Sequence, residues 1–422
     1  MALTNPQETI LTRPTCCEFT SGRVFYGSGN TVYYSQVLEN VSMTKVDQCY
    51  QVNDPTSEHI SDLLATDGGT VQIDNATDII QIKKFGGGVL VYATNGVWYL
   101  HGVEGGFTAI NYAMDLVSEA GCISAQAVVP AEATQYYWSG EGLYAITLNQ
   151  FGKAEAQNII EGTLQTHYNA IPRASKQKAT GTYNRIRKQI EWHYPLLGDY
   201  DYLHAMDASL LLDTRTGGIW PQSYSAITVE GVGNFIACSV NTNQGTEDRD
   251  SIKVVISTGT PNVTQTYNID FAFKDDVNFQ DFGAAYPTAY IETGYETLDK
   301  PSNKKVVPYI NTHFLQTEQN WIADGSGGLT LDLQSGCQMR AKWDWNDSSA
   351  NGRWSPAQQA YRFRRPFTPS VAGTFDSGET VIATKSKMLG RGEAISIRFE
   401  QETGKDMQLL GYTCVYSVKG RM

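Results

Sequence analysis

Apolar and polar residues alternate in short runs that predict β-hairpins along most of the chain. In residues 80–102, the segments 89–94 and 97–101 are rich in β-branched and aromatic residues and flank Asn95-Gly96. Asn-Gly readily supplies the two positive-φ residues of a type I′ turn, so we expect a two-residue turn there. Both faces of the first strand are apolar, which predicts an inner strand covered on both sides. The run Gly86-Gly87-Gly88 before it allows another backbone to approach closely.

The same order of strand, polar or Gly-containing turn and strand recurs elsewhere in the first half of the chain. It is found at residues 23–35, 136–146, 183–194 and 210–220. Turn centres near residues 96, 141 and 187 are about 45 residues apart, as in propeller repeats of about 40–50 residues. This spacing predicts a β-propeller-like domain of antiparallel hairpins.

Two segments in this half depart from the hairpin pattern. Residues 154–168 are the best helix candidate, because their apolar residues recur at near-helical spacing, although Gly162 weakens the pattern. Residues 53–78 predict a connecting loop with one short helical turn before Gly68-Gly69.

The pattern changes to longer strands after residue 281. Strands are expected at residues 286–295, 305–317, 337–345 and 360–364, with 395–399 paired to 408–418 across a polar turn. We therefore predict a propeller-like domain over residues 1–281 and a β-sandwich-like platform domain over residues 282–422.

Composition supports a mainly β fold and narrows the functional classes. The 422 residues include 39 Gly and 24 Tyr, a usage that favours strands and turns over helices. The net charge of −12 argues against a general nucleic-acid binder, which needs Lys and Arg to neutralise phosphates. Because no run of about 18 apolar residues occurs and the first residues have no apolar core, we expect a soluble, unexported protein without a membrane span.

Cysteine and histidine spacing predicts no metal site. The seven cysteines are odd in number and scattered, and they read as reduced packing residues: Cys16, Cys17, Cys49, Cys122, Cys238, Cys337 and Cys414. The six histidines show no zinc spacing: His59, His101, His167, His193, His204 and His313. Residues 344–348 (DWNDS) lack the glycine and the terminal glutamate of a calcium loop.

Catalytic motifs are equally absent from the sequence. Neither a GxSxG elbow nor a phosphate-binding GxxxxGK[ST] loop occurs. The pairs Asp199 and Asp201, and Asp275 and Asp276, could serve acid–base chemistry on a sugar, but solvated loop carboxylates are the favoured interpretation. We expect no catalytic, cofactor-binding or metal-binding residues and no cofactor.

Two basic clusters are candidates for interaction surfaces. Residues 173–188 (RASKQKATGTYNRIRK) carry Lys and Arg around Tyr183, which suits nucleic acid, a solvated face or an acidic neighbouring subunit. Arg362, Arg364 and Arg365 surround Phe363, a mixture of Arg with aromatic residues that is typical of protein interfaces.

Six ordered blocks of the sequence carry a family resemblance. They are GRVFYGSGNTVYYSQ (22–36), DPTSEHISDLLATDGGTVQI (54–73), VLVYATNGVWYLHG (89–102), NKKVVPYINTHFLQTE (303–318), CQMRAKWDWNDS (337–348) and SIRFEQETGKDMQLLGY (396–412). The chain resembles the tail nozzle proteins of short-tailed bacteriophages, also called tail tubular protein B.

The resemblance implies a structural virion protein of the phage tail, made in the host cytoplasm, and not an enzyme. Such proteins combine a β-propeller with sandwich-like platform elements and assemble as a homohexameric tube below the tail adaptor protein. Fibre or tip proteins attach to the tube, and double-stranded DNA passes through it without specific binding. For such a conduit we expect an acidic or neutral lumen and place the basic residues 173–188 away from it.

The alternative is a phage propeller that binds or cleaves a host surface glycan, as a receptor-binding protein or depolymerase. The Asp-box repeats of sialidase propellers (SxDxGxTW) are absent, and no set of acid, nucleophile and arginine stands out. Solution mass and glycan release would separate the two functions.

Overall fold

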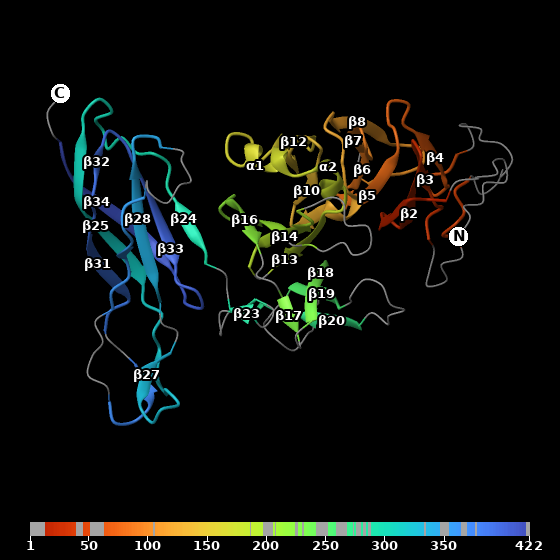
Figure 1. Ribbon diagram of the computed structural model, residues 1–422. Coiled ribbons are helices and arrows are strands. Elements are labelled where there is room, and N and C mark those ends of the chain that lie inside the picture. Colours follow the sequence, from red (N-terminus) through yellow and green to blue (C-terminus); the bar gives the residue numbers. More distant parts are fainter. Residues whose placement is uncertain are drawn as a thin grey trace. The chain divides into compact units, whose positions relative to one another are not determined.

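The computed structural model is mainly β, with two short α-helices and one 3₁₀ turn in the part that it describes (Figure 1). It describes residues 13–38, 45–50, 63–103, 106–185, 187–196, 206, 208–223, 288–332, 335–346, 354–363, 369–375 and 378–418, and the backbone of seven strands between 227 and 285. The chain divides into two compact units, one of Met1–Ser223 with Gly231–Ala272 and one of Tyr224–Glu230 with Phe273–Met422.

The first unit is built on four-stranded antiparallel sheets in which successive strands are neighbours. The first sheet has β1 (Cys16–Thr20), β2 (Arg23–Ser28), β3 (Thr31–Tyr34) and β4 (Gly69–Gln72). The second has β5 (Ile79–Phe85), β6 (Gly88–Ala93), β7 (Gly96–His101) and β8 (Ala113–Ser118). The third has β9 (Val129–Ala131), β10 (Thr134–Trp138), β11 (Leu143–Leu148) and β12 (Ala154–Asn158), preceded by the 3₁₀ turn Ala125–Ala127.

Two further sheets follow the same plan. The fourth has β13 (Thr180–Asn184), β14 (Gln189–Tyr194), β15 (Ala208–Asp213) and β16 (Ile219–Ser223). The fifth has β18 (Val232–Asn241), β19 (Ile252–Thr258) and β20 (Asn268–Ala272), together with β17 (Ile227–Val229), whose residues the division by contacts assigns to the second unit. The hairpins predicted at residues 23–35, 89–101, 136–146, 183–194 and 210–220 are confirmed.

Neighbouring sheets of the first unit pack face to face. One apolar core joins the first and second sheets, another joins the second and third, and a third joins the third and fourth. Between the first and second sheets the first strands β1 and β5 meet, and between the third and fourth sheets β9 and β13 meet, whereas the second and third sheets meet through their last strands β8 and β12. Four-stranded antiparallel sheets that pack face to face in sequence order give the propeller-like arrangement that the sequence predicts.

The β6–β7 hairpin forms, but its turn lies one residue earlier than predicted. Ala93 pairs with Gly96, so the two central residues are Thr94 and Asn95. Neither residue has a positive φ, and Gly96 is a strand residue outside the left-handed region. The prediction of a type I′ turn at Asn95-Gly96 was therefore wrong.

Packing explains why Asn95 and Gly96 occupy this hairpin. The Asn95 side chain accepts a hydrogen bond from the Thr77 backbone N–H at 2.9 Å and donates one to the Asn75 carbonyl at 2.7 Å. A Cβ on Gly96 would lie 2.8 Å from the Trp98 ring. Asn95 is therefore explained by its hydrogen bonds to the connection between β4 and β5, and Gly96 by the lack of space beside the Trp98 ring. A requirement for positive φ does not explain either residue.

The glycine run before β6 has the predicted function. A Cβ on Gly88 would lie 2.1 Å from the Leu100 carbonyl oxygen, so only glycine lets β7 approach this closely. All six residues of β6 are buried, which confirms an inner strand covered on both faces.

The helix predicted at residues 154–168 is wrong over its first half. Residues 154–158 form β12, which pairs with β11, and helix α1 (Gln165–Ala170) begins only after Gly162, whose φ is +78°. Hydrogen bonding to β11 of the third sheet stabilises residues 154–158 as a strand more than their weak helical periodicity stabilises a helix. A second short helix, α2 (Arg173–Gln177), follows.

The connecting loop expected at residues 53–78 contains a strand. Residues 69–72 form β4, which pairs with β3 and completes the first sheet. Most of the helical turn expected there lies outside the described residues.

The second unit is a β-sandwich with smaller additions. Its first sheet has the order β24 (Tyr290–Glu292), β33 (Ile395–Gln401), β28 (Cys337–Trp343), β29 (Gln358–Gln359). Its second has β31 (Val381–Lys387), β25 (Lys305–Leu315) and β32 (Arg391–Gly392), with β34 (Leu409–Val418) also on β25. Small sheets are formed by β27 (Leu329–Leu331), β26 (Asn320–Ala323) and β30 (Gly373–Thr374), and by β21 (Lys274–Asp275), β22 (Gln280–Asp281) and β23 (Ala284–Ala285).

Apolar side chains of both large sheets share one core. Ile310 and Phe314 from β25 pack with Met339 from β28 and Phe399 from β33. Residue 281, where we expected the domain boundary, lies in β22, and the division by contacts assigns that small sheet to the second unit.

The final two strands do not pair with each other as predicted. β33 lies between β24 and β28, whereas β34 lies on β25 in the opposite sheet. Phe399 and Tyr412 contact each other from opposite sides of the core, with ring centroids 5.4 Å apart. Residues 402–408 therefore cross between the sheets and do not close a hairpin, because both strands bury apolar side chains in one core.

Candidate interaction surface

The basic stretch at residues 173–188 does not form one surface. Lys176 is only 4% exposed, and its Nζ donates to the Gly140 carbonyl at 3.1 Å and lies 4.1 Å from the centre of the Tyr168 ring. Burial lowers the pKa of the Lys176 ammonium. Lys176 is therefore a packing residue between α2 and the third sheet, while Arg173, Arg185 and Arg187 are exposed.

The β13–β14 turn connects this stretch to the third sheet. Lys188 forms an ion pair with Glu132 of the β9–β10 turn, and the Tyr183 hydroxyl donates to the same carboxylate at 3.2 Å. The hydrogen bond from Lys188 lowers the pKa of Glu132. Lys188 and Glu132 both have positive φ in their turns.

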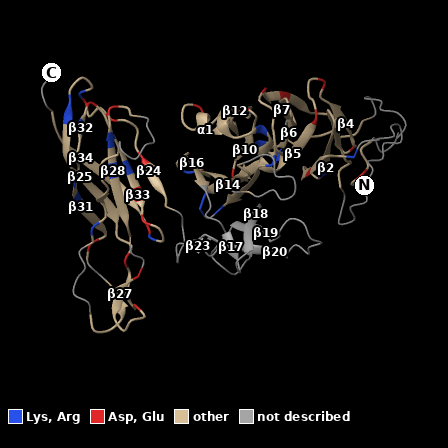
Figure 2. Cartoon of the chain, in the orientation of Figure 1, with Lys and Arg blue, Asp and Glu red and all other residues tan. Residues whose placement is uncertain are grey.

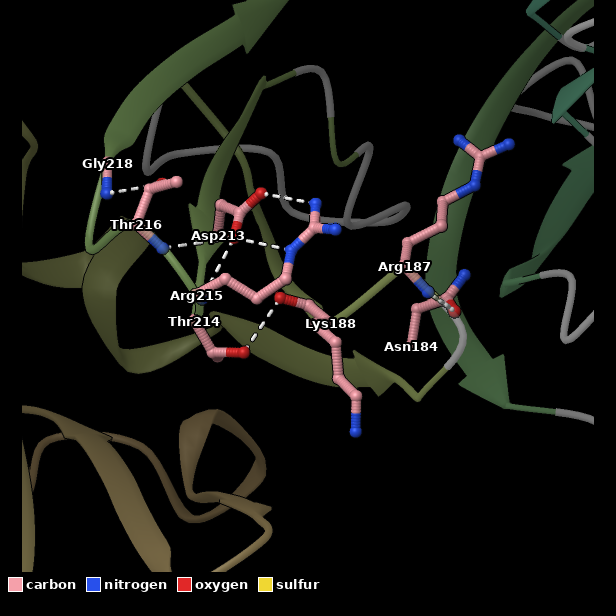
Figure 3. A network of polar contacts seen from close by, with 8 residues as sticks. All are labelled: Asn184, Arg187, Lys188, Asp213, Thr214, Arg215, Thr216 and Gly218. Carbon is pink, nitrogen blue, oxygen red and sulfur yellow. Dashed lines mark hydrogen bonds and ion pairs between the residues drawn. The ribbon is translucent and has the colours of Figure 1, made fainter.

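A polar network joins the same turn to the β15–β16 turn (Figure 3). The Asp213 carboxylate accepts hydrogen bonds from the Arg215 backbone N–H and guanidinium, both at 2.9 Å, and these bonds lower the pKa of Asp213. The Lys188 carbonyl accepts from the Thr214 N–H and hydroxyl, both at 2.8 Å. These contacts fix the shape of the fourth sheet's end, so part of the basic stretch has a structural role.

The remaining candidate residues from the sequence are dispersed. Asp344 lies in a turn after β28 with φ +58° and accepts from the Glu393 N–H at 2.6 Å, so this segment is a polar turn at a strand end. Arg362 is exposed. Outside the described side chains lie Asp199, Asp201, Asp275, Asp276, Arg364 and Arg365. Among the side chains that are described, no group of three or more His, Cys, Asp or Glu could hold a metal.

Six of the seven cysteines have described side chains, and none of these six is in a disulfide: Cys16, Cys17, Cys49, Cys122, Cys337 and Cys414. Burial raises the pKa of Cys49, Cys122 and Cys337 to about 12. Cys17 is exposed.

Cysteine alkylation should follow this burial. Because the thiolate is the nucleophile, iodoacetamide at about pH 8 should modify Cys17 first and leave Cys49, Cys122 and Cys337 unmodified in the folded protein. Peptide mass spectrometry before and after denaturation measures this order. Labelling of the three buried thiols as fast as Cys17 in the folded protein would contradict it.

The second unit carries a surface of charged and aromatic side chains that was not predicted from the sequence. Lys and Arg occur along the strands of this unit (Figure 2). We call it the cation–aromatic face, and it comprises Tyr290, Glu292, Arg340, Lys342, Trp354, Arg398 and Glu400 on and beside the sheet β24-β33-β28-β29. Strand alternation creates it, since Met339 and Ala341 point into the core while Arg340 and Lys342 point outward.

Cationic side chains lie against aromatic rings on this face. The Arg398 guanidinium lies 3.7 Å from the centre of the Tyr290 ring. The Lys342 Nζ lies 2.7 Å from Glu292 Oε1 and 4.8 Å from the centre of the Trp354 ring. The alternation of Gln338, Arg340 and Lys342 in CQMRAKW was the available sequence signal.

Comparison with known proteins does not assign a family. No protein-family model and no curated protein matches the sequence. A protein from Lactobacillus plantarum is similar with TM-score 0.35 and 10% identity, over 76% of this chain and 84% of that one. The tricorn protease is similar with TM-score 0.29 and 11% identity, over 62% of this chain and 21% of that one.

An exo-β-1,3-galactanase from Phanerochaete chrysosporium is also similar, with TM-score 0.27 and 8% identity, over 97% of this chain and 96% of that one. Similarities this weak carry no information about function. No helix in the described ranges is both long and apolar enough to cross a membrane.

Proposed function

We propose that this protein is a structural subunit of a bacteriophage tail nozzle, a ring-shaped homo-oligomer that conducts the genome out of the particle. The observation that carries the proposal is the position in the structure of two of the six sequence blocks that resemble tail nozzle proteins. Residues 337–348 and 396–412 supply β28 and β33, whose outward side chains make up most of the cation–aromatic face. Arg, Tyr and Trp are the residues in which protein interfaces concentrate their binding energy.

The fold and the charge support the same function. A propeller-like unit joined to a β-sandwich is the combination that the resemblance implies. The net charge of −12 suits a wall along which DNA moves, because a basic wall would bind each passing phosphate. By the same resemblance we propose six copies, the tail adaptor protein and fibre or tip proteins as neighbours, and the virion tail as the location.

Solution mass tests this proposal. Light scattering of the purified 46.6 kDa chain over a concentration series should show a closed assembly of several copies, with six as the expected number. A monomer at every concentration would contradict it. Release of sugar from a host surface polysaccharide by the same preparation would instead support the glycan-cleaving alternative.

A further inference from the structure

Two arginines of the cation–aromatic face are directly opposite each other. Arg340 of β28 and Arg398 of β33 are register partners in the antiparallel pair. They share one carboxylate, since Glu400 lies 3.5 Å from Arg340 Nε and 3.3 Å from Arg398 Nε. Like charges directly opposite each other destabilise a sheet. Glu400 can balance only one of these two charges, so one positive charge at the contact has no counter-charge among these three residues.

Both guanidinium groups have unused hydrogen-bonding capacity. Within the described part of the chain, no hydrogen bond from the Nη atoms of Arg340 or Arg398 is found, and their side chains are 35% and 27% exposed. Each guanidinium presents N–H donors in a planar fork that matches a carboxylate.

The arginine pair is also held in position before any ligand binds. The Tyr290 ring stacks against the Arg398 guanidinium, and the centre of the Trp354 ring lies 5.8 Å from the same guanidinium. These contacts already restrict the Arg398 side chain, so it loses little conformational freedom when a ligand binds. Lys342 is already neutralised by Glu292, which leaves one net positive charge on Arg340, Arg398 and Glu400. The local geometry is that of a preorganised site for one anion.

We propose that Arg340 and Arg398 bind a carboxylate side chain of a neighbouring copy of this chain, which rests on the proposed homo-oligomeric function. A second copy offers carboxylates for this site, because the chain carries 44 acidic residues against 32 Lys and Arg. The aromatic surroundings fit a protein partner, since Tyr290 is 57% exposed beside the guanidinium. The site would join each subunit to the next in the ring.

The test compares two double variants with wild type. The double variant Arg340→Gln with Arg398→Gln removes both guanidinium groups and two positive charges. Lys385→Gln with Lys387→Gln removes two charges from exposed positions on β31, in the other sheet of the same unit, and is the matched control. Light scattering and sedimentation measure the dissociation constant, thermal unfolding measures Tm, and anisotropy measures binding to a labelled DNA duplex.

The arginine variant should raise the dissociation constant of the assembly by about 30-fold or more. Its Tm, compared with wild type at a concentration at which both proteins are monomeric, should be equal or higher because the like-charge contact is gone. The lysine control should assemble as wild type does. An arginine variant that assembles with the wild-type constant would overturn the inference and leave the proposed function intact.

Three other outcomes also decide the question. A wild-type protein that is monomeric throughout overturns both the inference and the proposed function. Loss of DNA binding by the arginine variant with unchanged assembly would make the ligand a phosphate and overturn the inference. A lower Tm for this variant with unchanged assembly would give the two arginines a structural role only, which also overturns it.

Discussion

Replacing Trp192 by alanine should lower the free energy of unfolding of the first unit by about 3–5 kcal/mol. Trp192 lies on β14, is fully buried, and belongs to the core that joins the third and fourth sheets. Its ring packs near Trp138, with centroids 6.3 Å apart, and its Nε1 donates to the Ala127 carbonyl at 3.0 Å. Alanine removes the apolar contacts, leaves a cavity and takes the donor away from the Ala127 carbonyl. The loss of apolar burial, the cavity and the lost hydrogen bond each lower the free energy of unfolding.

Trp220→Ala is the matched control for this substitution. Trp220 is on β16 of the same sheet but is 39% exposed, so its loss should change the unfolding free energy much less. Urea unfolding followed by circular dichroism compares the two variants. Equal destabilisation by both would show that the core between the third and fourth sheets is not packed as described.

Replacing Arg23 by methionine should destabilise the first sheet by about 2–6 kcal/mol. Arg23 is 1% exposed; its Nη1 donates to the Ser35 carbonyl at 2.8 Å and to the Asp67 carbonyl, and its Nη2 donates to the Ala65 carbonyl. Its guanidinium also lies 5.6 Å from the Tyr34 ring centre and 5.9 Å from that of Phe107. Methionine has similar length but no donor, so three carbonyls lose this donor. The two in buried hydrogen bonds, of Ser35 and Asp67, cost about 1–3 kcal/mol each, whereas the exposed Ala65 can hydrogen-bond to water instead.

Lys84→Met provides the comparison, since Lys84 is an exposed residue of β5. It should leave the urea midpoint nearly unchanged, whereas Arg23→Met should lower it without changing the slope of the transition. An Arg23→Met protein as stable as wild type would mean that these hydrogen bonds add nothing to stability.

Hairpins could be predicted from the sequence because strand alternation and turn residues are local signals. The repeat length could not be read correctly from turn spacing alone. The turns at residues 96 and 141 join the second and third strands of their sheets, whereas the turn at residue 187 joins the first and second strands of the fourth. Two kinds of turn were counted as one series, and only tertiary pairing distinguishes them.

Sequence proximity also misled the search for a surface. Residues 173–188 are basic in sequence, yet the fold buries Lys176 and engages Lys188 with Glu132. The cation–aromatic face brings together Tyr290, Arg340 and Arg398 from separate strands, and their proximity depends on sheet register. Alternation within β28 was visible in the sequence, but its pairing with β33 was not, because β33 was assigned to a hairpin with β34.

Imaging of the purified protein tests the central claim, assembly into a ring around a channel, most directly. Two-dimensional averages of negatively stained particles should show rings with a stain-filled centre and rotational symmetry, six-fold by the family resemblance. Averages that contain only solid particles of single-chain size would contradict the claim.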